Sequence, residues 1–383
     1  MKKTLSTLFL ILVFCFCKSV YCQKISIQNK EELHYNDKVI SLSYSEIFKK
    51  NPWIKEGNFK VINSKTQQEI PYQLEYSGNK TPLNLLVQLS LNEKEKIQLE
   101  LLKEKPSDFP TKTFGRYVPE RADDFAWEND KIAFRTYGKA LELNPKQNAY
   151  GIDVWVKRTT KMVINERYSR GKYHEDHGDG MDYYHVGYTL GAGNCAPYVN
   201  DSIWYSKNYT RYEILDNGPL RTTFKLYYDT WNVDGHEVKA VKTIRLDAGS
   251  QLNQVEMNYQ VEGLTHIPIV IGIIKRDQVG TELFDIKGGV LGYWEPTEAK
   301  YGTTGVGVII PTKVKNMYLR KDQYLAFTDV PTNTTFTYYT GAAWDRAGEI
   351  TTAKDWFSYL QVRKEELKSN KIKIKYSILN ELQ

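Results

Sequence analysis

One stretch of the chain, "YHEDHGDGMDYYHV" from Tyr173 to Val186, is crowded with side chains that can do chemistry. It holds three histidines, four acidic residues and three tyrosines. Histidine titrates near neutral pH, carboxylates bind metal ions or exchange protons, and tyrosine can donate a proton. Three interpretations are open: a metal site, an acid/base site, or a polar loop without chemistry.

A metal site would use His174 and His177, with Asp176 and Asp182 as oxygen ligands. Imidazole and carboxylate groups of this kind bind zinc, manganese or calcium. Their spacing matches neither H-E-x-x-H nor the D-x-[DN]-x-[DN]-G series of a calcium loop. A divalent metal is therefore a conceivable cofactor, but the spacing does not establish one.

Acid/base chemistry on a sugar is the second interpretation. A histidine can take a proton from a sugar carbon, and a tyrosine can protonate the departing group. If that carbon lies next to a carboxylate, proton removal creates a dianionic species, and a cation must hold the carboxylate. The catalytic candidates in this stretch are His174, His177, Tyr173 and Tyr184.

A second segment, "GRYVPERADDFAWENDKIAFRTYG" from Gly115 to Gly138, could supply the cation. An arginine can pair with a carboxylate through two parallel hydrogen bonds. Acidic residues of this segment also leave glycoside hydrolysis open, because sequence gives no separation between carboxylates. The substrate-binding candidates are Arg116, Arg121, Arg135, Trp127, Asp124 and Glu128.

Composition narrows the class of protein. An apolar run after Lys2 and Lys3 predicts an export signal over residues 1–22, and no later segment approaches the ~20 apolar residues of a membrane span. A net charge of +6 without a concentrated basic face does not indicate nucleic-acid binding. Cys195 is the one cysteine after the signal, and we expect it to be a buried structural thiol. We therefore expect an exported protein, periplasmic or secreted.

The hydrophobic pattern predicts an all-β chain. Alternation is clear in "LVQLSL", "KIQLELL", "GIDVWVKR", "TTFKLYYDTW" and "KIKIKYSIL", and "NEKE" between the first two indicates a hairpin turn. The one helical pattern is "TAKDWFSYLQVRKEEL", with Thr352 as its N-cap.

Two domains are expected. The polar, proline-containing residues 103–113 form the predicted linker between a small β domain at 23–102 and a large domain at 114–383. So many strands must stack to bury one face each, which predicts a large antiparallel β-sandwich with an open groove. The 28 tyrosines and 8 tryptophans would suit stacking on sugar rings, although strands filling a core explain most of them.

Other catalytic templates are absent: the sequence contains no G-x-S-x-G elbow, no phosphate loop and no Rossmann fingerprint after a strand. Several long motifs instead resemble a family of exported proteins encoded in polysaccharide-utilisation loci of Bacteroidetes, most of it long classed as a domain of unknown function. They are "RYVPERADDFAWENDKIAFRTYG", "GIDVWVKR", "YHEDHGDGMDYYHVG", "LGAGN", "NGPLRTTFKLYY", "GYWEP" and "GAAWD". The fold implied is a galactose-mutarotase-like supersandwich.

Within that family, the chain is most similar to the oligosaccharide dehydratases of ulvan breakdown. This resemblance implies elimination of water from a non-reducing-end uronic acid, which leaves a 4,5-unsaturated uronyl end. The partner implied is a uronic-acid-containing, sulfated or unsulfated oligosaccharide. We assign roles from the chemistry: His174 or His177 as base at C5, Tyr184 or Tyr173 as acid to the C4 hydroxyl, and Arg121 or Arg135 on the carboxylate. A glycoside hydrolase, a polysaccharide lyase and a non-catalytic carbohydrate-binding protein are the alternatives.

Overall fold

The computed structural model describes residues 23–144, 146–369 and 371–378. The predicted export signal at 1–22 lies outside them. Most described residues with regular structure are β strands, and every pairing between named strands is antiparallel. The predicted all-β class is therefore confirmed. No helix in the described part of the chain has the length and apolar character needed to cross a membrane.

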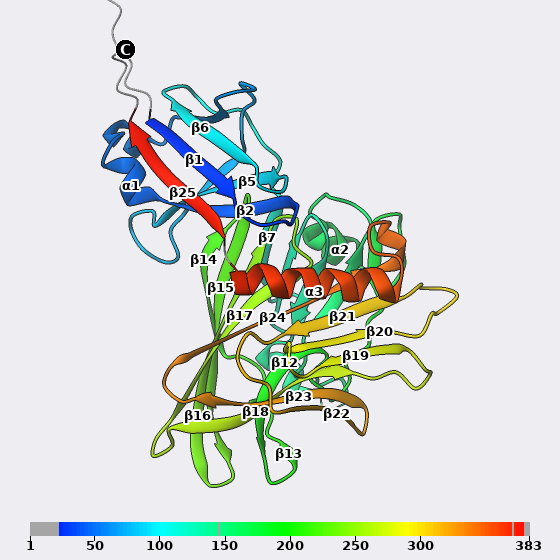
Figure 1. Cartoon of the computed structure of the whole chain (residues 1–383). Coiled ribbons are helices and arrows are strands. Elements are labelled where there is room, and N and C mark those ends of the chain that lie inside the picture. The colour runs from blue at the N-terminus through cyan, green and yellow to red at the C-terminus, as the bar shows by residue number, and fades with distance from the viewer. Residues whose placement is uncertain (1–22, 145, 370, 379–383) are drawn as a thin grey trace, which may run out of the picture.

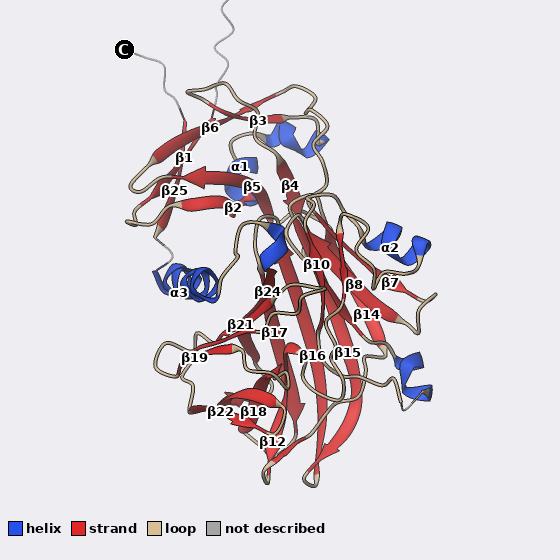
Figure 2. Ribbon diagram, turned by 90° about the vertical axis from the view of Figure 1, so that its right-hand side faces the viewer, coloured by secondary structure: helices blue, strands red, loops and turns tan. Residues whose placement is uncertain are grey.

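A small domain forms one end of the molecule (Figures 1 and 2). Its sheets enclose one apolar core that includes Ile25, Phe59 and Leu99. A four-stranded sheet has the order β25 (Ile372–Ile378), β1 (Gln23–Asn29), β6 (Lys96–Leu102), β3 (Lys60–Asn63), and a three-stranded sheet has the order β2 (Tyr35–Ser43), β5 (Asn84–Leu91), β4 (Tyr72–Glu75). The short helices α1 (Tyr44–Phe48) and η1 (Pro52–Glu56) complete the domain.

Two expectations about this domain need correction. The last strand, β25, pairs with β1 rather than with the large domain, and red β25 lies beside blue β1 in Figure 1. The alternation in β25 predicted that one face is buried but not against which core. Ile372, Ile374 and Tyr376 pack against the core of the small domain. The "NEKE" turn also joins no hairpin, because β5 and β6 belong to different sheets. Periodicity predicts a strand but not its partner.

The large domain contains three sheets. One five-stranded sheet has the order β11 (Gly180–Asp182), β10 (Asp153–Lys157), β9 (Ala133–Thr136), β8 (Asp124–Asn129), β7 (Thr113–Val118). A second has the order β13 (Ser202–Ile203), β12 (Ala192–Val199), β18 (His266–Ile274), β23 (Gln323–Pro331), β22 (Asn316–Arg320). The eight-stranded sheet has the order β14 (Arg211–Asn217), β15 (Arg221–Val233), β16 (His236–Asp247), β17 (Leu252–Val261), β24 (Thr335–Trp344), β21 (Thr304–Ile309), β20 (Val290–Trp294), β19 (Thr281–Asp285).

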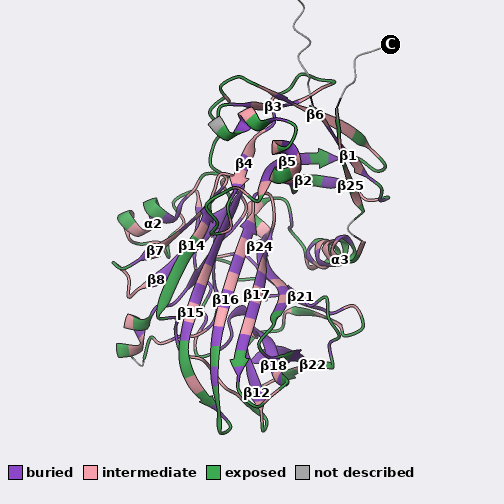
Figure 3. Ribbon diagram, turned by 90° about the vertical axis from the view of Figure 1, so that its left-hand side faces the viewer, coloured by how far each residue is buried: buried purple, intermediate pink, exposed green. Residues whose placement is uncertain are grey.

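The main core draws side chains from all three sheets, for example Trp127, Ile271 and Tyr259. Figure 3 shows the resulting alternation of buried and less buried residues along β15 to β17. Cys195 is buried in this core, as expected, with its Sγ 3.4 Å from the Tyr259 hydroxyl. The remaining helical turns of the domain are α2 (Ile164–Arg170), η2 (Lys139–Leu143) and η3 (Asp345–Ala347).

The predicted long helix is confirmed as α3 (Ala353–Ser369), and Thr352 Oγ1 accepts from the Asp355 N–H at 3.2 Å at its start. Trp356 and Leu360 lie on its buried face and pack over β20 and β21. The approach is close because Gly307 on β21 has no Cβ. An added Cβ there would lie 2.6 Å from Leu360 Cδ1.

Candidate functional site

A cavity of about 690 Å³ brings the two polar segments of the sequence together. One segment contributes Arg121 and Arg135, and the other contributes the stretch around His174. The lining residues are Arg121, Arg135, Tyr137, Lys146, Gln147, Asn148, Ala149, Tyr173, His174, Asp182, Tyr183, Tyr184, His185, Val186, Gly187 and Tyr188. Of the ten catalytic and substrate-binding candidates, those lining it are Arg121, Arg135, Tyr173, His174 and Tyr184.

Strand pairing places the charged centre of this cavity. Arg135 on β9 lies directly opposite Asp153 on β10, and Asp182 on β11 lies opposite Trp155 on β10. The first residue of β8, Asp124, completes the group. Three acidic side chains from three strands thereby meet one guanidinium group.

The Arg135 guanidinium is buried among these carboxylates, with the side chain 4% exposed. Nη2 donates to Asp153 Oδ2 at 2.5 Å and to Asp182 Oδ2 at 2.9 Å, and Nη1 lies 3.8 Å from Asp124 Oδ2. Nε and Nη1 have no hydrogen-bond partner among the described residues. Arg135 is therefore already neutralised by the protein, yet it keeps two donors unused.

Burial changes the protonation of two of the acids. It raises the pKa of Asp182 to about 8, with a further upward contribution from the negative charge of Asp153. It raises the pKa of Asp124 to about 6, although Arg135 and Arg121 both oppose the shift. Asp182 thus holds its proton at neutral pH. The remaining carboxylates are balanced by Arg135 and by Arg121, which donates to Asp124 at 3.0 Å.

His174 is oriented for use as a base. Its side chain is 67% exposed, and Nδ1 lies 2.7 Å from the backbone carbonyl oxygen of Asp182. A carbonyl only accepts, so Nδ1 carries the hydrogen and Nε2 keeps the lone pair in the neutral ring. The Asp182 carboxyl lies 3.6 Å from the same Nδ1. A proton taken up at Nε2 would therefore create a charge beside Asp182.

Tyr184 supplies a hydroxyl without an acceptor. The residue is 3% exposed, and its hydroxyl has no hydrogen-bond partner in the part of the chain that the structure describes. Burial raises its pKa well above the ordinary value, so the phenol stays protonated. The Arg276 guanidinium lies 4.5 Å from the ring centroid and donates to Glu295 at 2.6 Å. Burial in turn raises the pKa of Glu295 to about 7.

Trp127 and Glu128 are not substrate-binding residues in this structure, which corrects both predictions. Each is 0% exposed. Trp127 belongs to the main core and donates from Nε1 to Asn253 at 2.7 Å. Glu128 accepts from Lys157 Nζ at 2.6 Å and from the backbone N–H of Ile164 at 2.8 Å. These consecutive residues face opposite sides of β8, and both are inside because every residue of β8 is buried, which a polar composition did not reveal.

Arg116 and His177 do not line this cavity, and their predicted roles stay predictions. Arg116 donates to Glu120 at 2.5 Å and lies 5.4 Å from the Tyr168 ring centroid. His177 has a side chain 34% exposed and lies near Glu175.

The hypothetical metal set is not assembled. Asp176 is paired with Arg158 and caps the N–H of Gly178 at 2.8 Å, while Asp182 is bound to Arg135. Among residues 23–144, 146–369 and 371–378, no three histidine, cysteine or acidic side chains are grouped as metal ligands. The residues present therefore do not fit the divalent ion that the sequence left open.

Several important residues escaped the sequence analysis. Asp153 was seen only as part of an alternating strand, although an acid within the apolar "GIDVWVKR" was a usable signal. Tyr137, Arg276 and Glu295 stood in motifs without a chemical pattern. They reach the site through strand pairing and packing.

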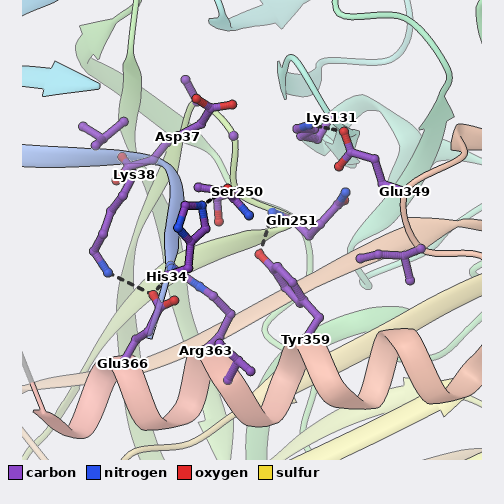
Figure 4. Close-up of a pocket in the computed structure, with 17 residues that line it drawn as sticks. His34, Asp37, Lys38, Lys131, Ser250, Gln251, Glu349, Tyr359, Arg363 and Glu366 are labelled. Carbon is purple, nitrogen blue, oxygen red and sulfur yellow. Dashed lines mark hydrogen bonds and ion pairs between the residues drawn. The ribbon is translucent and has the colours of Figure 1, made fainter. Parts of the chain in front are cut away.

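A second cavity, of about 470 Å³, lies between the small domain, α3 and the large domain (Figure 4). Its charged groups are paired with one another. Lys38 donates to Glu366 at 2.9 Å, Arg363 is bonded to the same carboxylate, and Lys131 pairs with Glu349. None of the sequence-predicted residues lines it, so we place the candidate site in the first cavity.

The fold and the site define an antiparallel all-β protein with a cavity of buried carboxylates and guanidinium groups. The chain belongs to the family described as "Domain of unknown function (DUF4861)", which matches it over residues 27–374. A relative from Formosa agariphila, named "Uncharacterized protein P7", is 33% identical over 304 residues, which cover 74% of this chain and 75% of the relative.

The chain is also similar to solved structures of carbohydrate-active proteins. A glycosyl hydrolase family 38 protein from Enterococcus faecalis has a TM-score of 0.48 at 7% identity, covering 94% of this chain and 48% of that one. A putative kojibiose phosphorylase from the human microbiome has a TM-score of 0.39 at 12% identity, covering 68% and 37%. The chain thus spans less than half the length of either protein. Likenesses of this size do not define an activity.

Proposed function

We propose that the protein is a carbon–oxygen lyase, a dehydratase that eliminates water from the non-reducing-end uronic acid of ulvan-type oligosaccharides. The product is a 4,5-unsaturated uronyl end. One observation supports this best: His174 with a free Nε2, the unpartnered Tyr184 hydroxyl and the Arg121 guanidinium line the same cavity. These are the base, acid and carboxylate-binding groups that a β-elimination beside a carboxylate requires. The mutarotase-like supersandwich is part of the same proposal.

The elimination assigns one step to each group. His174 Nε2 removes the proton from C5, and the electron pair forms the C4=C5 double bond as the C4–O bond breaks. The Tyr184 hydroxyl gives its proton to the departing hydroxide, which leaves as water. Afterwards the proton on His174 is returned to the tyrosinate through solvent or a neighbouring group. Tyr173, which also lines the cavity, is the alternative acid.

Arg121 is the better anchor for the substrate carboxylate. Its side chain is 27% exposed, whereas that of Arg135 is 4% exposed and already contacts Asp153 and Asp182. Among the described residues, the ion pair of Arg121 is with Asp124, at 3.0 Å. A uronate reaching the cavity can therefore pair with Arg121 without displacing a buried ion pair.

The assay uses uronyl oligosaccharides prepared from sulfated and desulfated ulvan, with and without a chelator. A dehydratase produces the ultraviolet absorbance of a conjugated unsaturated acid without new reducing ends, and the chelator leaves the rate unchanged. A polysaccharide lyase acting on the acidic polysaccharide would produce both signals, and a glycoside hydrolase would produce reducing ends alone. Neither signal together with a mobility shift in a polysaccharide gel would indicate a binding protein. Each of these last three results would overturn the proposal.

A further inference from the structure

Three tyrosines form a cluster at one side of the candidate cavity. The ring centroids of Tyr150 and Tyr205 lie 5.3 and 5.0 Å from that of Tyr188, and 5.6 Å from each other. Tyr188 is 63% exposed and lines the cavity, whereas the other two are half-buried beneath it. The cluster therefore presents one exposed aromatic ring in the lining of the cavity.

The two supporting rings are held by polar contacts. Asn148 Nδ2 donates to the Tyr150 hydroxyl at 2.8 Å, and Gln323 Nε2 donates to the Tyr205 hydroxyl at 3.3 Å. Gln323 is itself fixed, because its Oε1 accepts from the backbone N–H of Leu190 at 2.8 Å. A single exposed aromatic ring is ordinary, but here two neighbouring rings, each held by a side-chain hydrogen bond, pack against it.

The surroundings of Tyr188 suit a sugar. Polar side chains that can bond to hydroxyl groups line the same cavity, namely Gln147, Asn148 and His185. An aromatic face with polar groups at its edge binds the apolar face of a sugar ring and its hydroxyls together. Of the other tyrosines in the lining, Tyr184 and Tyr137 are buried and Tyr173 and Tyr183 are half-buried, so Tyr188 offers the most exposed ring.

We propose that Tyr188, supported by Tyr150 and Tyr205, is the stacking platform for the second sugar residue of the substrate. This inference rests on the proposed function, because the uronyl end must occupy the cavity for the next residue to reach Tyr188. The protein then selects oligosaccharides of two or more units over free uronic acids. Tyr188 determines specificity and takes no part in the elimination.

The test compares Tyr188→Ala and Tyr188→Phe with the control Tyr76→Ala, which removes a tyrosine 38% exposed on the small domain. Substrates are a free uronic acid and a tetrasaccharide ending in that acid. We expect Tyr188→Ala to lower kcat/KM for the tetrasaccharide about tenfold, the effect of losing one aromatic stacking contact. Tyr188→Phe and Tyr76→Ala should stay near wild type, and the free acid should be insensitive to all three.

Equal losses on both substrates, or no loss on either, would overturn the platform. A binding measurement separates this inference from the proposed function. Calorimetry compares tetrasaccharide binding by His174→Ala with binding by the double variant that also carries Tyr188→Ala. If the wild type eliminates no water, weaker binding by the added Tyr188→Ala change still supports the platform. Unchanged binding refutes it. If the protein binds no tetrasaccharide at all, the platform is refuted whatever the activity on free acids.

Discussion

The proton on Asp182 makes stability depend on pH in a specific direction. Burial and Asp153 raise the pKa of Asp182 from 3.8 to about 8, so the folded chain keeps a proton that the unfolded chain releases between those values. The stabilisation from this proton is complete below about pH 4 and is lost as the pH rises to about 8. Between pH 6 and pH 8 the loss amounts to about 2 kcal/mol of unfolding free energy.

Asp182→Asn removes this titration while keeping the backbone carbonyl that accepts from His174. Urea unfolding at pH 6, 7 and 8, followed by fluorescence, gives the pH dependence of each variant. From pH 6 to pH 8 we expect the unfolding free energy of the wild type to fall by about 2 kcal/mol more than that of Asp182→Asn. This difference does not depend on the absolute stability of the variant. Asp229→Asn, at an exposed position, should behave like the wild type. If Asp182→Asn loses as much stability as the wild type, Asp182 does not hold a proton at neutral pH.

Three further predictions test the assignments. Lys157→Met should lower the unfolding free energy in urea by about 3–5 kcal/mol, because it leaves the fully buried Glu128 carboxylate without its ion-pair partner. Lys131→Met, whose partner Glu349 is 59% exposed, should lower it by less than about 1 kcal/mol. Equal effects would contradict the structural role of the buried pair. Arg121→Ala should raise KM for uronyl oligosaccharides by about tenfold or more through loss of a charge-assisted contact, and an unchanged KM would exclude it as the anchor. His174→Ala should lower kcat by roughly 10²- to 10⁴-fold and His177→Ala should leave it near wild type, as measured by the absorbance of the product; the reverse order would transfer the role of base to His177.

Much of the secondary structure was predictable because it depends on local pattern. The alternation of "KIKIKYSIL" predicted a strand, and the apolar spacing from Ala353 to Leu360 predicted α3 with its cap. Strand partners were not predictable, because pairing is decided by tertiary contacts far apart in the chain. β25 forms one edge of the four-stranded sheet of the small domain. "NEKE" connects strands of two different sheets rather than two neighbouring strands of one sheet.

Sequence indicated the two segments that meet at the cavity, but only some of the residues that line it. Polar residue types on β8 indicated a site, yet β8 is buried on both faces, so Glu128 and Trp127 lie in the interior, while Asp124 is the first residue of the strand. Sequence could not show that Glu128 meets Lys157, since the pair forms between strands that are not neighbours in the sheet. Asp153 was not predicted as a site residue, because its position in an alternating strand did not show that it lies opposite Arg135 on β9.

The charges of the cavity explain why an acid and a base can stand ready there together. If all three acids around Arg135 were ionised, the two arginines could not balance them, and burial makes that excess costly. Burial and the charge of Asp153 raise the pKa of Asp182, so a proton on Asp182 relieves the imbalance. When His174 takes up a substrate proton, the new positive charge lies 3.6 Å from the Asp182 carboxyl and favours release of its proton. In the proposed elimination, the proton that His174 gains is matched by the proton that Tyr184 gives to the departing hydroxide, so the site as a whole gains no charge.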